Sequence, residues 1–371
     1  MRGNHSEQQE DMFSYVSLED AVPLDHPIRK IKKLIDPILD ELWPEFDGLY
    51  SSSGRPSIPP EQLLKALLLQ VLFTIRSERQ LVEQLKYNLL YRWFVGLGMT
   101  GQVWDRSTFS KNRDRLVTGE IADRFFEQII SLAERKNLIS REHFSVDGTL
   151  VQAWASLKSF QKKEDSSKED NQTKDNSDKD PKGRNQEIDF KGEKRSNKTH
   201  ESKTDPEARL YTKLRAGTSQ INYMGHVLME NRNGLAVDHR LTEPGYHEEP
   251  MAAFEMTQGL PDGGKKTLGA DKHYDQGYLT ESLTGMGVVS HAAQNFHARK
   301  FSSSIDNGLA KQKGYEISRR KRKRVEEIFG WLKTIGLMRR PMMRGKAKMD
   351  WAFTFSLCVY NLVRIKGLCE V

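Results

Sequence analysis

The chain has 371 residues, of which 37% are hydrophobic and 29% are charged, and its formal net charge at pH 7 is +7. This length allows two domains of ordinary size, and the excess of basic residues favours a polyanionic partner. Cys358 and Cys369 are the two cysteines, which excludes a disulfide framework, so we expect a reducing, cytoplasmic location. The apolar stretches are too short to cross a bilayer and the first ten residues do not form a signal peptide, so we expect no membrane partner.

Residues 1–138 are expected to form an all-helical domain. Apolar residues at helical spacing predict helices over Glu61–Phe73 and Glu78–Val95. A glycine-bearing break at 96–101 precedes a basic helix that contains Lys111–Leu116. Short helices with a basic last member fit a helix-turn-helix, and they fit an ordinary helical bundle with a solvated face equally well. Both interpretations remain open at this point.

Residues 139–371 change in character and predict a mixed α/β domain. Alternating apolar and polar residues mark a strand at His143–Asp147, and a polar stretch at about 157–206 follows, which we expect to be largely disordered. Further strands are expected at 208–213, 221–230, 235–241, 266–271 and 288–292. Helices are expected at 248–258, 277–285, 316–335 and 350–365. Hairpin-linked strands followed by alternating helix and strand indicate a mixed sheet.

Two aspartates at the ends of predicted strands are candidates for a metal site. Asp147 precedes Gly148, and an aspartate in that setting is commonly a turn or cap residue. Asp271 leaves an apolar strand and has an equally ordinary interpretation as a helix cap, for which Asp275 competes. The catalytic interpretation requires both carboxylates to point into one cleft.

A third carboxylate, Glu326, lies on a predicted helix with Arg322 four residues before it and Lys333 seven residues after it. These spacings place the three side chains on one helical face, which would suit a metal ion and a phosphate held together. The alternative is a surface ion pair between Arg322 and Glu326. Glu327 is the obvious rival to Glu326, but its helical angle turns it towards solvent. Since Mg²⁺ prefers carboxylate oxygens, three such groups could hold the two ions of a phosphodiester-cleaving site.

Three segments together resemble one protein family: Phe144-Ser-Val-Asp-Gly-Thr149, Thr267-Leu-Gly-Ala-Asp-Lys-His-Tyr274 and Arg322-Lys-Arg-Val-Glu-Glu-Ile-Phe-Gly-Trp-Leu-Lys333. The chain resembles bacterial insertion-sequence DDE transposases of the insertion-sequence-five type. The resemblance implies an RNase H-like catalytic fold and assigns Asp147, Asp271 and Glu326 to metal binding, with two Mg²⁺ as cofactors and Mn²⁺ as a substitute. Arg319 stands where the Y-R-E-K signature of that family has tyrosine, which puts an aromatic contact in doubt.

The resemblance also implies a function. We expect binding to the inverted repeats that end an element, hydrolysis of the DNA backbone and transfer of the freed 3′-hydroxyl to target DNA. Double-stranded DNA would be the partner, bound by a homodimer or larger oligomer at the bacterial nucleoid. The expected DNA-contacting residues are Arg322, Lys333, Arg319, Lys321, Arg324, Lys111, Arg113 and Arg115. The alternatives are an RNase H-like nuclease without strand transfer and a catalytically silent DNA-binding descendant.

Overall fold

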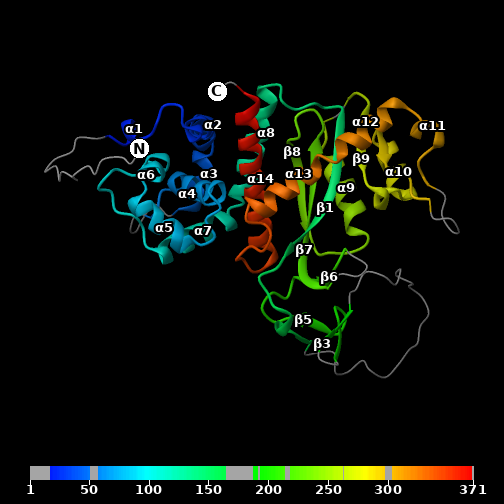
Figure 1. The fold of residues 1–371 in the computed structure, drawn as a ribbon, viewed down its shortest axis with the longest axis horizontal. Helices are drawn as coiled ribbons and strands as arrows, with labels where there is room; N and C mark the ends of the chain where they lie inside the picture. The colour runs from blue at the N-terminus through cyan, green and yellow to red at the C-terminus, as the bar shows by residue number, and fades with distance from the viewer. Residues whose placement is uncertain are drawn as a thin grey trace, which may run out of the picture.

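The computed structural model describes residues 17–50, 57–163, 187–190, 193–213, 218–261, 263–296 and 303–369, and it divides into a helical region and a mixed α/β region (Figure 1). Eight helices precede the first strand in the described chain: α1 (Leu18–Ala21), α2 (Pro27–Glu41), α3 (Trp43–Leu49), α4 (Pro60–Leu72), α5 (Glu78–Tyr87), α6 (Leu89–Val95), α7 (Arg106–Thr118) and α8 (Ile121–Arg135). Ser77 and Asn88 cap α5 and α6 by accepting backbone N–H groups, and Gly96 ends α6 in the left-handed conformation.

A six-stranded mixed sheet forms the centre of the second region. Its strands are β1 (His143–Gln152), β6 (Arg209–Tyr211), β7 (Gln220–Glu230), β8 (Ala236–Thr242), β9 (Lys266–Ala270) and β10 (Val288–Ala292). The order is β10-β9-β1-β7-β6, with β8 also on β7; β9 is parallel to β1 and β10, whereas β7 is antiparallel to β1 and β8. The expected fold class, an RNase H-like mixed sheet preceded by helices, is confirmed.

Helices cover both faces of this sheet. They are α9 (Glu248–Gln258), α10 (Gly277–Gly285), α11 (Asn307–Ala310), α12 (Lys313–Arg322), α13 (Val325–Thr334) and α14 (Lys346–Leu368). One face packs against α9, and the other packs against α12, α13 and α14. The largely buried helix α14 also packs on α8, α2 and α4, so it lies between the helical region and the sheet (Figure 1). One hydrophobic core therefore runs from the N-terminal helices through α14 to the sheet, and a second lies between the sheet and helices α9 and α10. None of the described helices has the length and apolar composition needed to cross a membrane.

The helix expected over 316–335 is interrupted, so the expectation of one continuous helix is wrong. α12 ends at Arg322 and α13 begins at Val325. Between them the backbone bonds span three residues, as in the bond from Glu326 N to Lys323 O of 3.2 Å, so a tighter helical turn joins the two helices. The Arg324 side chain turns away to donate to the carbonyl groups of Asn231, Arg232 and Asn233 in the β7–β8 turn.

Part of the polar stretch at 157–206 is ordered, which corrects the expectation of disorder for those residues. It contains β2 (Phe160–Lys162), β3 (Glu187–Phe190), β4 (Glu193–Ser196) and β5 (His200–Ser202), paired as β2-β5 and β3-β4. Phe160 is buried, and Asp205 accepts a 2.6 Å hydrogen bond from the buried Tyr223 hydroxyl, which ties the stretch to the sheet. Residues 164–186 and 191–192 lie outside the described chain.

Candidate active site

Asp147 and Asp271 lie at the same edge of the central sheet. β1 pairs with the parallel strand β9 over His143–Ser145, ending with Ser145 opposite Gly269. Two residues further on, the same register places Asp147 next to Asp271, which directly follows β9. The parallel pairing of β1 with β9 thus brings together two side chains that lie far apart in the sequence. Asp147 itself lies in the middle of β1, not at its end as expected.

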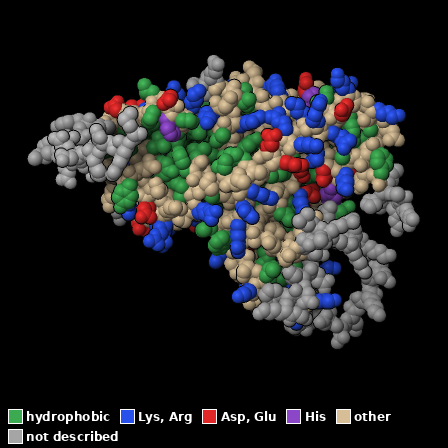
Figure 2. Space-filling view, viewed as in Figure 1, with side chains coloured by type: hydrophobic (Ala, Val, Ile, Leu, Met, Phe, Trp, Pro, Cys, Tyr) green, Lys and Arg blue, Asp and Glu red, His purple; other side chains and the backbone are tan. Residues whose placement is uncertain are grey.

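The environment of Asp147 disfavours its charged form. Burial, with a smaller contribution from the nearby carboxylates of Asp271 and Glu249, raises the pKa of Asp147 to about 6, against the opposing effects of the Lys213 ammonium and the Gly148 N–H. A carboxylate with this surplus of negative charge favours a cation. Figure 2 shows acidic side chains gathered among lysines and arginines on this half of the molecule.

Arg322 supplies one of the cations at this site. Its Nη1 lies 3.4 Å from Oδ2 of Asp147, with side chains that are 19% and 17% exposed. In the described chain Arg322 makes no ion pair with Glu326, so the expected surface ion pair is absent. This contact joins the C-terminal end of α12 to β1.

Lys213 and Glu249 complete the cluster, and the sequence analysis missed both. Lys213 Nζ donates to Oε1 of Glu249 and to the carbonyl oxygen of Gly148, each at 2.5 Å. Oε2 of Glu249, in the first turn of α9, lies 3.7 Å from Nε2 of His273, and Glu249 is only 5% exposed. A buried carboxylate on an otherwise apolar helix face would have been the signal, but the sequence places Lys213 and Glu249 far from Asp147.

Gly148 makes this arrangement possible, and Asp147 before it lies within β1 and not in the turn that was its alternative interpretation. Gly148 lies inside β1 with its α-carbon facing α9, and a Cβ at this position would lie 2.7 Å from Oε1 of Glu249. The same Cβ would lie 3.1 Å from Nδ1 of the buried His226. Glycine inside a strand marks a close approach by another group, here the Glu249 carboxylate.

Asp271 and Asp275 have different structural roles. Oδ1 of Asp271 accepts a 2.7 Å bond from the His273 N–H and so caps a short helical turn, as its alternative interpretation required. Asp275 accepts hydrogen bonds from the N–H groups of Asn295 and Ser304 and from the hydroxyl groups of Ser303 and Ser304. Asp275 therefore closes a loop, and Asp271 remains the carboxylate beside Asp147.

Glu326 is exposed in the first turn of α13, four residues after Arg322. Within the described chain no hydrogen bond or ion pair connects Glu326 with Asp147 or Asp271. The same described residues contain no group of three His, Cys, Asp or Glu side chains that converges as a ready metal site. The catalytic role of the three carboxylates thus stays a prediction, with Asp147 and Asp271 together and Glu326 at the rim.

The basic residues expected to contact DNA fall into two groups. Lys321, Arg319, Lys111 and Arg115 are exposed; Arg319 lies over the Tyr315 ring at 5.9 Å, and Arg115 lies over the Tyr50 ring at 5.5 Å. Lys333 is partly buried, and burial lowers its pKa, as does the charge of Lys213.

Two other members of that set are engaged within the protein. Arg113 forms ion pairs with Glu78 and with Asp114, the latter at 2.8 Å. Arg324 is held by the β7–β8 turn as described above. Their guanidinium groups are therefore part of the fold, and a phosphate would have to compete with these partners.

Comparison with known proteins finds one family model, described as "Transposase domain (DUF772)", which matches residues 16–115. No curated protein matches the chain. Among solved structures, the chain is similar to the piggyBac transposase synaptic complex with hairpin DNA, at 10% sequence identity and a TM-score of 0.43. That match covers 92% of this chain and 75% of the piggyBac chain. The Mos1 transposase paired-end complex with the left transposon end matches with 12% identity, 83% of this chain, 88% of that chain and a TM-score of 0.20.

The family model covers about a quarter of the sequence, all of it in the helical region, and does not reach Asp147. Residues 16–115 therefore correspond to a transposase domain.

Proposed function

We propose that the chain is a DNA transposase of the DDE type, which cuts element ends and joins the freed 3′-hydroxyl groups to target DNA. One observation carries the proposal: Asp147 in β1 and Asp271 directly after β9 lie next to each other on two parallel neighbouring strands, with Arg322 on Asp147. The match of residues 16–115 to a transposase domain supports the choice of substrate.

The donor set fits magnesium. Carboxylate oxygens are the ligands that Mg²⁺ prefers, and it is commonly held by one or two carboxylates, with waters and substrate phosphates as the other ligands. Asp147 and Asp271 would hold the metal, and Glu326, which follows Arg322 by about one helical turn, would be the third carboxylate. Two bound Mg²⁺ ions would polarise the phosphate and lower the pKa of the attacking water, and Mn²⁺ could replace them.

The chain's own cations would position the DNA. Arg322 and Lys333 would bind the phosphates that flank the cut, and Lys213 adds a third ammonium or guanidinium group on the same side of Asp147. Fixed cations stabilise charge that develops on a phosphate without rearrangement during the reaction. Arg319 and Lys321 extend this surface. Arg324 is bound by backbone carbonyls, so we leave it out of the phosphate contacts.

The helical region would bind the element ends. Lys111 and Arg115 are exposed on and near α7 and could contact the DNA backbone, whereas Arg113 would first have to release Glu78. Both ends of an element must be cut together, so we propose at least a dimer on DNA. The nucleoid of the bacterial cytoplasm would be the place of action.

The test is Mg²⁺-dependent cleavage of an inverted-repeat duplex by the wild type and by Asp271→Asn. Asparagine keeps the Oδ1 acceptor that caps His273, so the variant should fold, and we expect cleavage to fall by several orders of magnitude. Asp275→Asn is the contrast, because any loss of activity there should come with a lower melting temperature. Equal cleavage by the wild type and Asp271→Asn would refute the assigned role.

Strand transfer needs a separate assay. Supplying precut ends with free 3′-hydroxyl groups and looking for joined products distinguishes a transposase from a nuclease of the same fold. Duplex binding without cleavage in any divalent metal would instead support a catalytically silent DNA-binding protein.

A further inference from the structure

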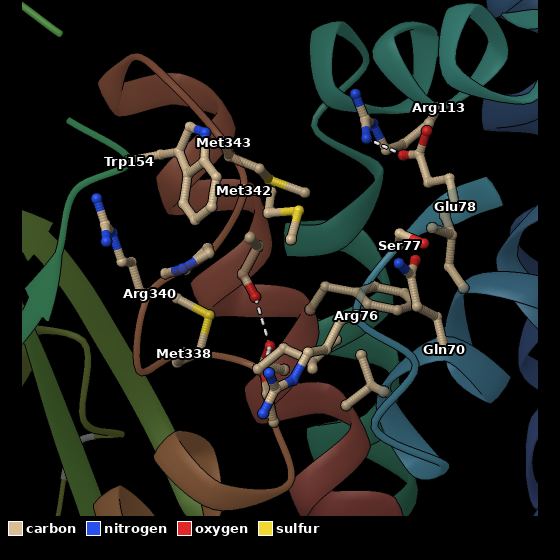
Figure 3. Close-up of a pocket in the computed structure, with 18 of the residues that line it drawn as sticks. Gln70, Arg76, Ser77, Glu78, Arg113, Trp154, Met338, Arg340, Met342 and Met343 are labelled. Carbon is tan, nitrogen blue, oxygen red and sulfur yellow. Dashed lines mark hydrogen bonds and ion pairs between the residues drawn. The ribbon is translucent and has the colours of Figure 1, made fainter. Parts of the chain in front are cut away.

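A groove of about 1270 Å³ lies between the helical region and the C-terminal part of the chain. Figure 3 shows its two walls: Arg76, Ser77, Glu78 and Arg113 project from the N-terminal side. Trp154, Met338, Arg340, Met342 and Met343 line the opposite side. The walls come from segments far apart in the sequence, so only folding creates this groove.

The lining is strongly basic. Eight arginines and lysines line the groove, and Glu78 is its one acidic lining residue, already paired with Arg113. None of the other seven cations forms an ion pair with an acidic side chain of the described chain; the most exposed of them include Arg76, Arg79 and Arg339. So many unpaired like charges around one concave surface favour a polyanion.

The apolar part of the lining restricts which polyanion fits. Trp154 lies on the groove with the Arg340 guanidinium 4.9 Å above its ring, beside the partly buried Met343 and the 55% exposed Met342. Aromatic rings, guanidinium planes and thioethers are surfaces on which a nucleobase can stack. A duplex hides its base faces within its own stack, whereas an unpaired strand exposes them. We propose that this groove binds single-stranded DNA.

Strand β1 connects the groove with the candidate active site. Gln152, which lines it, is the last residue of the strand that carries Asp147, five positions earlier, or about 17 Å along the strand. Lys333 lines the groove and is close enough to Lys213 for their charges to interact. Resting on the proposed function, the occupant is the unpaired strand that leaves the cut site.

The experiment compares two labelled probes of equal charge, an oligothymidylate of about 12 nucleotides and an abasic deoxyribose-phosphate chain of the same length, by fluorescence anisotropy. The wild type should bind the thymidylate about ten-fold more tightly, since one stacked base contributes roughly that much. Trp154→Ala and Met342→Ala should reduce that ratio towards one. Met342 is exposed, so its variant cannot owe a loss to unfolding.

Charge is tested separately with Arg76→Gln/Arg79→Gln. This pair should weaken both probes alike and reduce the slope of log affinity against log salt by roughly 1.4, or about 0.7 per lost contact. The control for Trp154→Ala is Trp43→Ala, at a 53% exposed tryptophan outside the groove. The control for the arginine pair is Lys33→Gln/Lys136→Gln, at two exposed lysines outside the groove. Both controls should leave the affinity for each probe unchanged.

Equal wild-type affinity for the two probes, or an unchanged ratio in Trp154→Ala, overturns the proposed site. If the same protein still cuts an inverted-repeat duplex, the groove assignment alone fails. If it neither binds nor cuts DNA in any form, the proposed function fails with it.

Discussion

Replacing Gly148 by alanine tests the packing that brings Glu249 to the candidate site. The new Cβ would lie 2.7 Å from Oε1 and 3.3 Å from Cγ of Glu249, and 3.1 Å from Nδ1 of His226. Glu249 is 5% exposed and His226 is fully buried, so neither can move into solvent without leaving its partners. The carboxylate must shift, and its 2.5 Å contact with Lys213 is lost or stretched.

The magnitude follows from two opposing effects. Adding a methyl group to a filled interior costs about 1–3 kcal/mol, and a weakened contact to the partly exposed Lys213 adds about 1 kcal/mol. Alanine restricts the unfolded chain more than glycine does, which returns about 0.4–1 kcal/mol. We expect Gly148→Ala to lower the free energy of unfolding by about 2 kcal/mol.

Urea unfolding of the wild type, Gly148→Ala and Gly330→Ala measures this. Gly330 lies in α13, and a Cβ there would meet nothing within 4 Å, so Gly330→Ala should stabilise the protein by about 1 kcal/mol. In a Glu249→Ala background the cost of Gly148→Ala should shrink, because its main obstacle is gone. A Gly148→Ala variant as stable as the wild type would refute the close-packing argument.

Three further predictions concern charges held inside the fold. Arg324→Ala should lower the free energy of unfolding by about 2 kcal/mol, because three turn carbonyls lose their donor. The control Arg320→Ala, at an exposed residue of α12, should change it by less than about 0.5 kcal/mol. Equal effects of the two substitutions would mean that Arg324 is not structural. Lys213→Ala should lower the free energy of unfolding by about 2 kcal/mol, because it leaves the buried Glu249 carboxylate without its cation. The double variant with Glu249→Gln should recover most of that loss in thermal unfolding, and additive losses would contradict the pairing. Burial raises the pKa of Asp350 to about 6, so the ionisation of Asp350 opposes folding. The resulting loss in the free energy of unfolding is absent below about pH 4, grows between pH 4 and 6, and reaches up to about 3 kcal/mol above pH 6. Asp350→Asn should therefore be more stable than the wild type at pH 7.5 and equally stable near pH 4, and a difference independent of pH would be incompatible with this account.

The kinds of element, and most of their positions, could be predicted from local pattern. Helical spacing of apolar residues predicted α4 and a helix over residues 78–95, which the structure divides at Asn88 into α5 and α6 because the Asn88 side chain caps α6. Period-two alternation predicted the first half of β1. The polar stretch at 157–206 was harder, because Phe160 and Asp205 are ordered by contacts with distant strands and not by any local pattern.

The candidate site divides in the same way. Asp147 and Asp271 were identifiable because each lies on or after a predicted strand, and parallel neighbours bring such positions together. No local pattern places Lys213 and Glu249 beside Asp147, since the contacts of both with Gly148 depend on the approach of α9 to β1.

The stripe of Arg322, Glu326 and Lys333 shows where local reasoning ends. The three residues belong to two helices, since α12 ends at Arg322 and α13 begins at Val325, and the Arg324 side chain between them binds carbonyls of a hairpin about 90 residues earlier. By itself the sequence determined the elements, the excess of positive charge and the two strand-borne aspartates. The tertiary structure alone decided which cation contacts Asp147 and how the N-terminal helices and the segment 338–343 enclose a basic groove, because those contacts depend on segments far apart in the chain.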